Sequence, residues 1–117
     1  MDGNVRESIL NSVKLYVGYT ADYTPFDEEL IMLINSNLRK LNQLGCGVPR
    51  FEISGPDEKW SDFLDDENTA AMAKEYVKIS VKLAHDPPQN SFLVSLLQEQ
   101  LKEVGWRINQ DAETPVD

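Results

Sequence analysis

The sequence has very little of the chemistry that disulfides and metal sites need. Its 117 residues include one cysteine, Cys46, and one histidine, His85. Because Cys46 has no partner in the chain, an internal disulfide and a cysteine-cluster zinc site are both excluded. A single imidazole also excludes zinc sites built from several histidines. A chain of this length can still bury a sizeable core without such staples.

Long apolar runs are also lacking. The longest, residues 30–34, is five residues long, far short of the roughly 20 residues that span a bilayer. Asp2 and Glu7 stand where a signal peptide would be basic and then apolar. We therefore expect a soluble protein, made inside the cell, that makes no contact with a membrane.

Acidic residues are what the sequence has in excess. It contains 20 Asp and Glu against 11 Lys and Arg, a formal net charge of −9. A field of this sign repels phosphate backbones, which argues against a protein that grips nucleic acid with its whole surface. The length predicts one domain. We place this domain at residues 1–109, followed by a polar tail at 110–117 that we expect to be disordered on its own.

The spacing of apolar residues predicts a mainly α fold, a small bundle of about four helices. The first helix is expected at residues 5–17, with Tyr16 on its apolar face. Asp2 or Asn4 is predicted to cap its start, and Gly18 to end it.

The second helix is the best specified by the sequence. Thr24 is predicted as its N-cap and Pro25 as its first residue, with Phe26 opening its apolar stripe. Acidic residues in its first turn and Arg39 near its end match the helix dipole. Gly45 is predicted to follow the helix in a left-handed conformation.

The third and fourth helices are less sharply defined. Residues 77–83 alternate as a strand would, but the helix-forming run 70–75 and lysines spaced four apart favour a helix. The fourth helix is predicted to begin after Asp86 as its N-cap. It carries an apolar side from Leu93 to Ile108.

Between the second and third helices, over residues 46–67, the helical period disappears. Residues 50–53 are the candidate for one short strand. Seven acidic residues and one lysine lie within 52–67. Disordered segments rarely carry two large aromatic residues three positions apart, so we expect Trp60 and Phe63 to pin this acidic loop to the core.

None of the chemically reactive residues points to catalysis. His85 and Asp86 form an acid–imidazole pair, but no nucleophile is placed to use it, and a histidine in the last turn of a helix interacts favourably with the carbonyl ends. Cys46 lacks a neighbouring base, which favours a small residue in a turn. The acidic loop lacks the spacing of a calcium loop. We therefore predict no enzyme, no cofactor and no metal.

Charged surfaces are the remaining candidates for function. Three lysines of the predicted third helix, Lys74, Lys78 and Lys82, lie four residues apart and therefore on one helical face. Such a stripe is typical of a solvated surface but also suits an interface with an acidic partner. Oppositely charged patches on one subunit can meet head-to-tail and close a ring. The candidate subunit-interface or channel residues are Asp57, Glu58, Asp62, Asp65, Asp66, Glu67, Lys74, Lys78 and Lys82.

Five strings, in order and over nearly the whole chain from about Ile9 to Asn109, resemble the head–tail connector or portal adaptor proteins of tailed bacteriophages of the siphophage type. No single string is diagnostic, whereas the ordered set is fairly specific. Cys46 and Gly105 depart from the residues expected there, a small aliphatic and a charged one. The strings are INS at 34–36, LNQLGCG at 41–47, WSDFL at 60–64, DPPQNSF at 86–92 and WRIN at 106–109.

The resemblance implies a virion protein that forms a ring of about twelve copies under the portal protein. Such a ring extends the DNA channel, lets DNA pass without specific binding and docks the stopper or tail-completion protein. It is assembled in the cytoplasm of the host bacterium and lies at the head–tail interface. The resemblance also implies that the C-terminal region, with Trp106, Arg107 and Asn109, contacts the portal.

A second hypothesis belongs to a different functional class. A small acidic protein can mimic the charge of DNA and inhibit a host nucleic-acid enzyme. A mimic should spread its carboxylates along exposed faces, whereas seven of the 20 acidic residues here crowd into one loop. The connector is therefore the leading hypothesis and the mimic the alternative.

Overall fold

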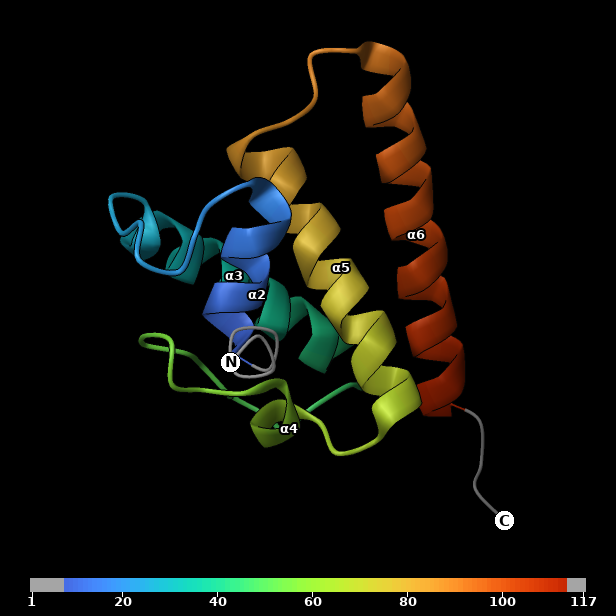
Figure 1. Cartoon of the computed structure of the whole chain (residues 1–117). Helices are drawn as coiled ribbons and strands as arrows, with labels where there is room; N and C mark the ends of the chain where they lie inside the picture. Colours follow the sequence, from blue (N-terminus) through green and yellow to red (C-terminus); the bar gives the residue numbers. More distant parts are fainter. Residues whose placement is uncertain (1–7, 114–117) are drawn as a thin grey trace.

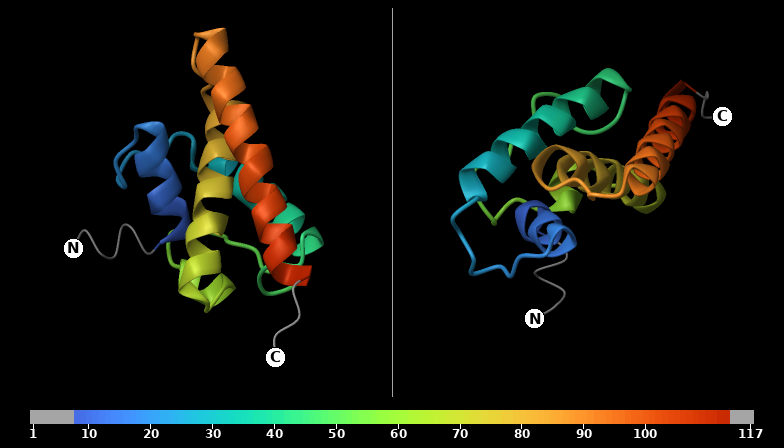
Figure 2. Two further views of the ribbon diagram at one scale, coloured as in Figure 1. Left: turned by 90° about the vertical axis from the view of Figure 1, so that its right-hand side faces the viewer. Right: turned by 90° about the horizontal axis from the view of Figure 1, so that it is seen from above.

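The computed structural model describes residues 8–113, with side chains from 8 to 110. This part of the chain is mainly helical and contains no strand, which confirms the predicted helical bundle. Helix α5 (Glu67–His85) is central: α2 (Ile9–Val17), α3 (Asp27–Gln43) and α6 (Ser91–Glu113) all pack against it. Figure 1 shows α6 running beside α5, and the view from above in Figure 2 shows α2 and α3 on the other flank of α5.

Ser8 is the N-cap of helix α2. Its Oγ accepts a hydrogen bond from the Asn11 backbone N–H at 3.2 Å. The predicted start at residues 5–7 and the predicted caps Asp2 and Asn4 lie outside the described residues. Gly18 ends the helix as predicted, with φ +104°. Tyr16 is 43% exposed, so its predicted place on the buried face is wrong.

Helix α3 begins at Asp27, so the predicted start at Pro25 with Thr24 as N-cap is wrong. The Asp27 N–H instead donates to the Thr24 carbonyl at 3.1 Å, which closes a turn before the helix. Phe26 leaves the apolar stripe and stacks on Tyr19, with ring centroids 5.6 Å apart. At the other end, Gly45 follows the helix with φ +89°, as predicted.

The candidate strand at residues 50–53 does not form, because its backbone finds a side-chain partner. The Ile53 N–H donates to Asn35 Oδ1 at 2.8 Å, and Asn35 Nδ2 donates to the Ile53 carbonyl at 3.0 Å. Asn42 holds the preceding turn in the same way, through the carbonyls of Cys46 and Val48. Two asparagines of α3 thus replace the neighbouring strand that a ladder would need.

The aromatic anchors of the acidic loop are confirmed. Trp60 and Phe63 bound the short helix α4 (Trp60–Phe63) and are 2% and 0% exposed. Trp60 Nε1 donates to Ser12 Oγ at 2.9 Å, which ties the loop to α2. The Phe63 ring covers Gly47 so closely that a Cβ there would overlap the ring.

The third predicted segment is a helix, α5, capped by Asp66. Helix α6 begins at Ser91, later than predicted, because Asn90 Oδ1 accepts from the Phe92 N–H at 2.8 Å. Asp86, the predicted cap, instead follows the end of α5.

Helix α6 continues through Gly105 to Glu113, so residues 110–113 of the predicted tail are helical, and 114–117 lie outside the described residues. Its first turns rise past the end of α5 (Figure 1). Leu93 and Leu96 are therefore exposed and not on a buried side, whereas Val104 and Ile108 are buried. Among the described helices, none combines the length and the apolar character needed to cross a membrane.

Candidate interaction surfaces

Three of the six candidate carboxylates of the acidic loop accept hydrogen bonds from backbone N–H groups close to them in the sequence. Glu58 accepts from the Ser54 N–H and hydroxyl at 3.1 Å, Asp62 from the Lys59 N–H at 2.9 Å, and Asp66 from the Thr69 N–H at 2.8 Å. The bonds from Thr69 lower the pKa of Asp66. The pKa of Glu58 is lowered because its hydrogen bonds outweigh the opposing effect of its partial burial. These three carboxylates therefore fix the shape of the loop.

The other three candidate acids, Asp57, Asp65 and Glu67, are exposed. Asp65 and Glu67 line one shallow hollow together with Lys74, at the point where α4 leads into α5. The acidic loop and the start of the lysine stripe are therefore neighbours on one side of the subunit.

The lysine stripe is divided between two environments. Lys82 lies 3.5 Å from Asp86, one helical turn on, in an ion pair at the end of α5. Lys74 and Lys78 instead line a groove between α2 and α5, which we call the lysine groove. It is lined by Ser12, Leu15, Tyr16, Lys74 and Lys78.

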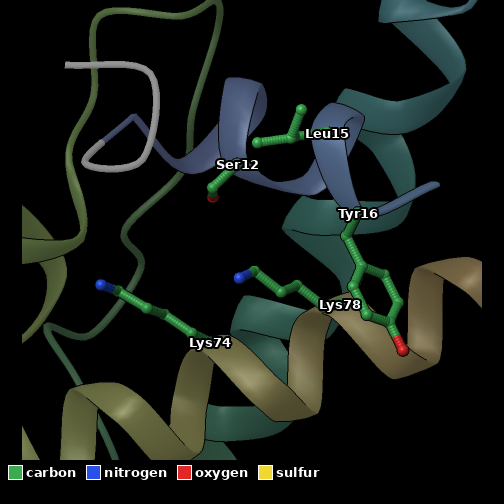
Figure 3. A pocket seen from close by; sticks show the side chains of 5 residues that line it. All are labelled: Ser12, Leu15, Tyr16, Lys74 and Lys78. Carbon is green, nitrogen blue, oxygen red and sulfur yellow. The ribbon is translucent and has the colours of Figure 1, made fainter. Parts of the chain in front are cut away.

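Figure 3 shows how the lysine groove is built. Lys78 extends from α5 into the space between α5 and α2, and Lys74 extends from α5 toward the neighbouring loop, while Ser12 and Tyr16 reach from α2 toward α5. Burial and the nearby Glu75 carboxylate raise the pKa of the Tyr16 hydroxyl. The groove continues past Tyr16 to Gln100 of α6, which donates to Glu75 at 2.6 Å. The result is an open positive surface with aromatic and aliphatic edges.

The portal-contact candidates lie on the last turns of α6 and have three different roles. Trp106 is 64% exposed. Arg107 is exposed and pairs with Glu103, one turn back, at 3.0 Å. Asn109 Nδ2 lies 3.4 Å from the Leu44 carbonyl and so attaches α6 to the end of α3. Trp106 is the one of the three that offers a large apolar side chain to a partner.

The structure contains a polar contact around His85 that sequence reasoning missed. His85 Nδ1 lies 2.5 Å from Glu29 at the start of α3, and Nε2 lies 2.9 Å from the Tyr19 hydroxyl. The ring does not cap its own helix but joins α5 to α3 and to the connecting loop. Since 56 residues separate His85 from Glu29, no local spacing could have identified the pair.

Cys46 behaves as a core residue. It is 3% exposed, and burial raises the pKa of its thiol to about 11. Within the described residues, no three His, Cys, Asp or Glu side chains gather closely enough to hold a metal ion.

Comparison with known protein families identifies the family of the chain. The family model described as phage connector protein matches residues 9–115. The chain belongs to the phage connector protein family. No curated protein and no solved structure matches the chain.

The strings that resemble phage connectors have defined structural roles in this connector. Asn35 and Asn42, from the first two strings, hold the backbone of the loop that follows α3. The WSDFL string at 60–64 supplies the two anchors of α4, and Asn90, from the fourth string, caps α6. Several residues of these strings therefore fix loops and helix ends.

Proposed function

We propose that this connector is a structural component of the virion that forms a ring of about twelve copies between the portal and the tail. The ring extends the DNA channel and offers a docking surface for the stopper or tail-completion protein. Its role is structural rather than catalytic. The observation that carries the proposal is the family match, which spans residues 9–115 of the 117 in the chain.

The acidic loop suits a place at the channel or at a subunit boundary. Asp57, Asp65 and Glu67 are exposed on a loop whose shape is fixed by Trp60 and Phe63. Carboxylates held in this way repel DNA phosphates, so DNA slides past without binding. Specific DNA contact is not needed for such a role.

The end of α6 suits contact with the portal. Trp106 is a large exposed aromatic side chain on a helix that the core holds through Val104 and Ile108. Aromatic residues presented on rigid elements are typical anchors of protein interfaces. Arg107 adds a charge beside it, and the chain continues from there toward its C-terminal residues.

The alternative, a DNA mimic, receives less support from the geometry. Glu58, Asp62 and Asp66 turn their carboxylates toward backbone N–H groups of their own loop. A mimic needs such groups projected outward at regular spacing.

Electron microscopy of the purified connector mixed with the portal protein of the same phage tests the proposal. We expect rings of the connector stacked on portal rings, with a continuous central channel. Absence of both ring formation and portal binding would overturn the proposal. Inhibition of a nucleic-acid enzyme by the isolated chain would favour the mimic.

A further inference from the structure

The lysine groove has the character of an unfilled contact site. Leu15 and Tyr16 at its edge are 52% and 43% exposed, although both are large apolar or aromatic side chains. Lys74 and Lys78 place positive charge beside them in a chain whose net charge is −9. A partner that fits this groove combines carboxylates with a large apolar side chain.

Such a surface occurs on the same chain, at the start of α3. Phe26, Glu28, Glu29 and Met32, which we call the α3 ridge, border one shallow depression. Met32 is 71% exposed, the largest exposure of the large apolar side chains in the described residues. Glu28 is exposed and makes no hydrogen bond or ion pair within the described residues. The α3 ridge therefore carries both the carboxylates and the large apolar side chain that a partner of the lysine groove needs.

The two surfaces are formed by different elements, the lysine groove by α2 and α5 and the α3 ridge by the start of α3. Seen from above, the start of α3 lies on one side of α5 and α6 lies on the other (Figure 2), and the groove continues as far as Gln100 of α6. Two different patches that complement each other generate head-to-tail contacts, which close into a ring when the rotation allows.

We propose that the α3 ridge of one subunit docks in the lysine groove of a second copy of this chain, with Glu28 facing Lys74 and Met32 packing against Leu15. The inference rests on the proposed function, because it names the surfaces that build the ring. The contact joins opposite charges and covers apolar side chains that the single subunit leaves exposed.

The acidic loop is a poorer partner for the lysine groove. Asp65 and Glu67 share a hollow with Lys74 of their own chain. Patches that adjoin on one side of a subunit favour a two-fold contact, which ends in a dimer and not in a ring.

A charge exchange tests the pairing. Lys74→Glu should raise the protein concentration needed for assembly about tenfold or more, and Glu28→Lys should act similarly. The double variant Lys74→Glu/Glu28→Lys should recover assembly, because each subunit then meets its neighbour with the charges reversed. Lys102→Glu, on an exposed part of α6, makes the same change in net charge away from both surfaces and is the matched control. Circular dichroism checks that each variant folds.

Cross-linking locates the contact directly. An equal mixture of Leu15→Cys and Met32→Cys subunits, treated with a short bismaleimide, should give covalent dimers. Each variant treated alone should give none, because two identical surfaces do not meet head-to-tail.

The outcomes separate the two proposals. If the unaltered protein forms rings, but Lys74→Glu assembles as Lys102→Glu does and the mixture gives no dimer, the pairing is wrong and the ring stands. If the unaltered protein forms no ring with or without portal, the proposed function fails and the pairing fails with it.

Discussion

The two tryptophans of this connector occupy opposite environments. Trp60 is 2% exposed and donates a hydrogen bond to Ser12, whereas Trp106 is 64% exposed on α6. Burial of a large aromatic side chain contributes several kcal/mol to folding, while an exposed one contributes little. The first tryptophan therefore serves the fold, and the second is available to a partner.

Trp60→Ala should lower the free energy of unfolding by about 3–5 kcal/mol, because it empties a packed site and removes the hydrogen bond that Trp60 donates to Ser12. Trp106→Ala should change it by less than about 0.5 kcal/mol. Urea unfolding followed by circular dichroism measures both values. If the proposed portal contact is correct, Trp106→Ala should also weaken portal binding. Equal destabilisation by the two variants would contradict the burial described here.

Cys46 offers a second test at the residue scale. With a pKa of about 11, roughly one thiol in a thousand is ionised at pH 8. Burial favours the protonated thiol in the folded state, so its contribution to stability is present below pH about 9 and is lost as the pH rises toward 11. Labelling with a thiol reagent at pH 8 should be at least about 100-fold slower in the folded protein than in urea. Rapid labelling of the folded protein would show that the 46–47 turn opens.

At the scale of the elements, two neighbouring N-cap signals can compete for the start of one helix. Asp86 before Pro87 and Asn90 before Ser91 are both good N-cap signals. The structure uses Asn90, whose Oδ1 accepts from two backbone N–H groups, and leaves Asp86 at the end of α5.

Separate alanine substitutions of Asn90 and Asp86 distinguish the roles of the two N-cap candidates. Asn90→Ala should lower the free energy of unfolding by about 1 kcal/mol, because the N–H groups of Phe92 and Leu93 lose their acceptor. Asp86→Ala should cost less than about 0.5 kcal/mol, since its contact with Lys82 is exposed. Asn90→Asp preserves the cap and is the control. Thermal unfolding of the three variants gives the comparison, and a larger loss for Asp86→Ala would restore the sequence-based prediction.

Some of the helices and loops could be predicted from the sequence, and others could not. Apolar spacing predicts most of the helices, and the helix-forming run 70–75 with the lysine spacing predicts the third. The anchors Trp60 and Phe63 are predicted because two large aromatic residues stand close together in an acidic loop. The absence of a strand at 50–53 depends on a partner far away in the sequence, Asn35. The start of α3 depends on the turn that the Asp27 N–H closes with the Thr24 carbonyl, which competes with the N-cap signal at Thr24. The lysine groove depends on how α2 lies across α5, which no local spacing encodes.

At the scale of the whole molecule, the acidic excess opposes assembly. Each subunit carries −9, so the proposed ring of about twelve copies would gather about a hundred negative charges. This repulsion acts over the Debye length, about 30 Å at 0.01 M salt and about 10 Å at 0.1 M. A contact such as the proposed pairing of Glu28 with Lys74 acts at short range and is partly shielded from solvent, so salt weakens it less.

Assembly of the unaltered connector should therefore increase as salt rises from about 10 to about 150 mM. Lys102→Glu makes the net charge more negative and should require more salt, whereas Glu99→Lys makes it less negative and should require less. Both positions are exposed on α6, outside the lysine groove and the α3 ridge. Sedimentation velocity at several salt concentrations measures the assembled fraction. If salt dissolves the rings instead, attraction between exposed charges governs assembly, and the acidic excess is not its main obstacle.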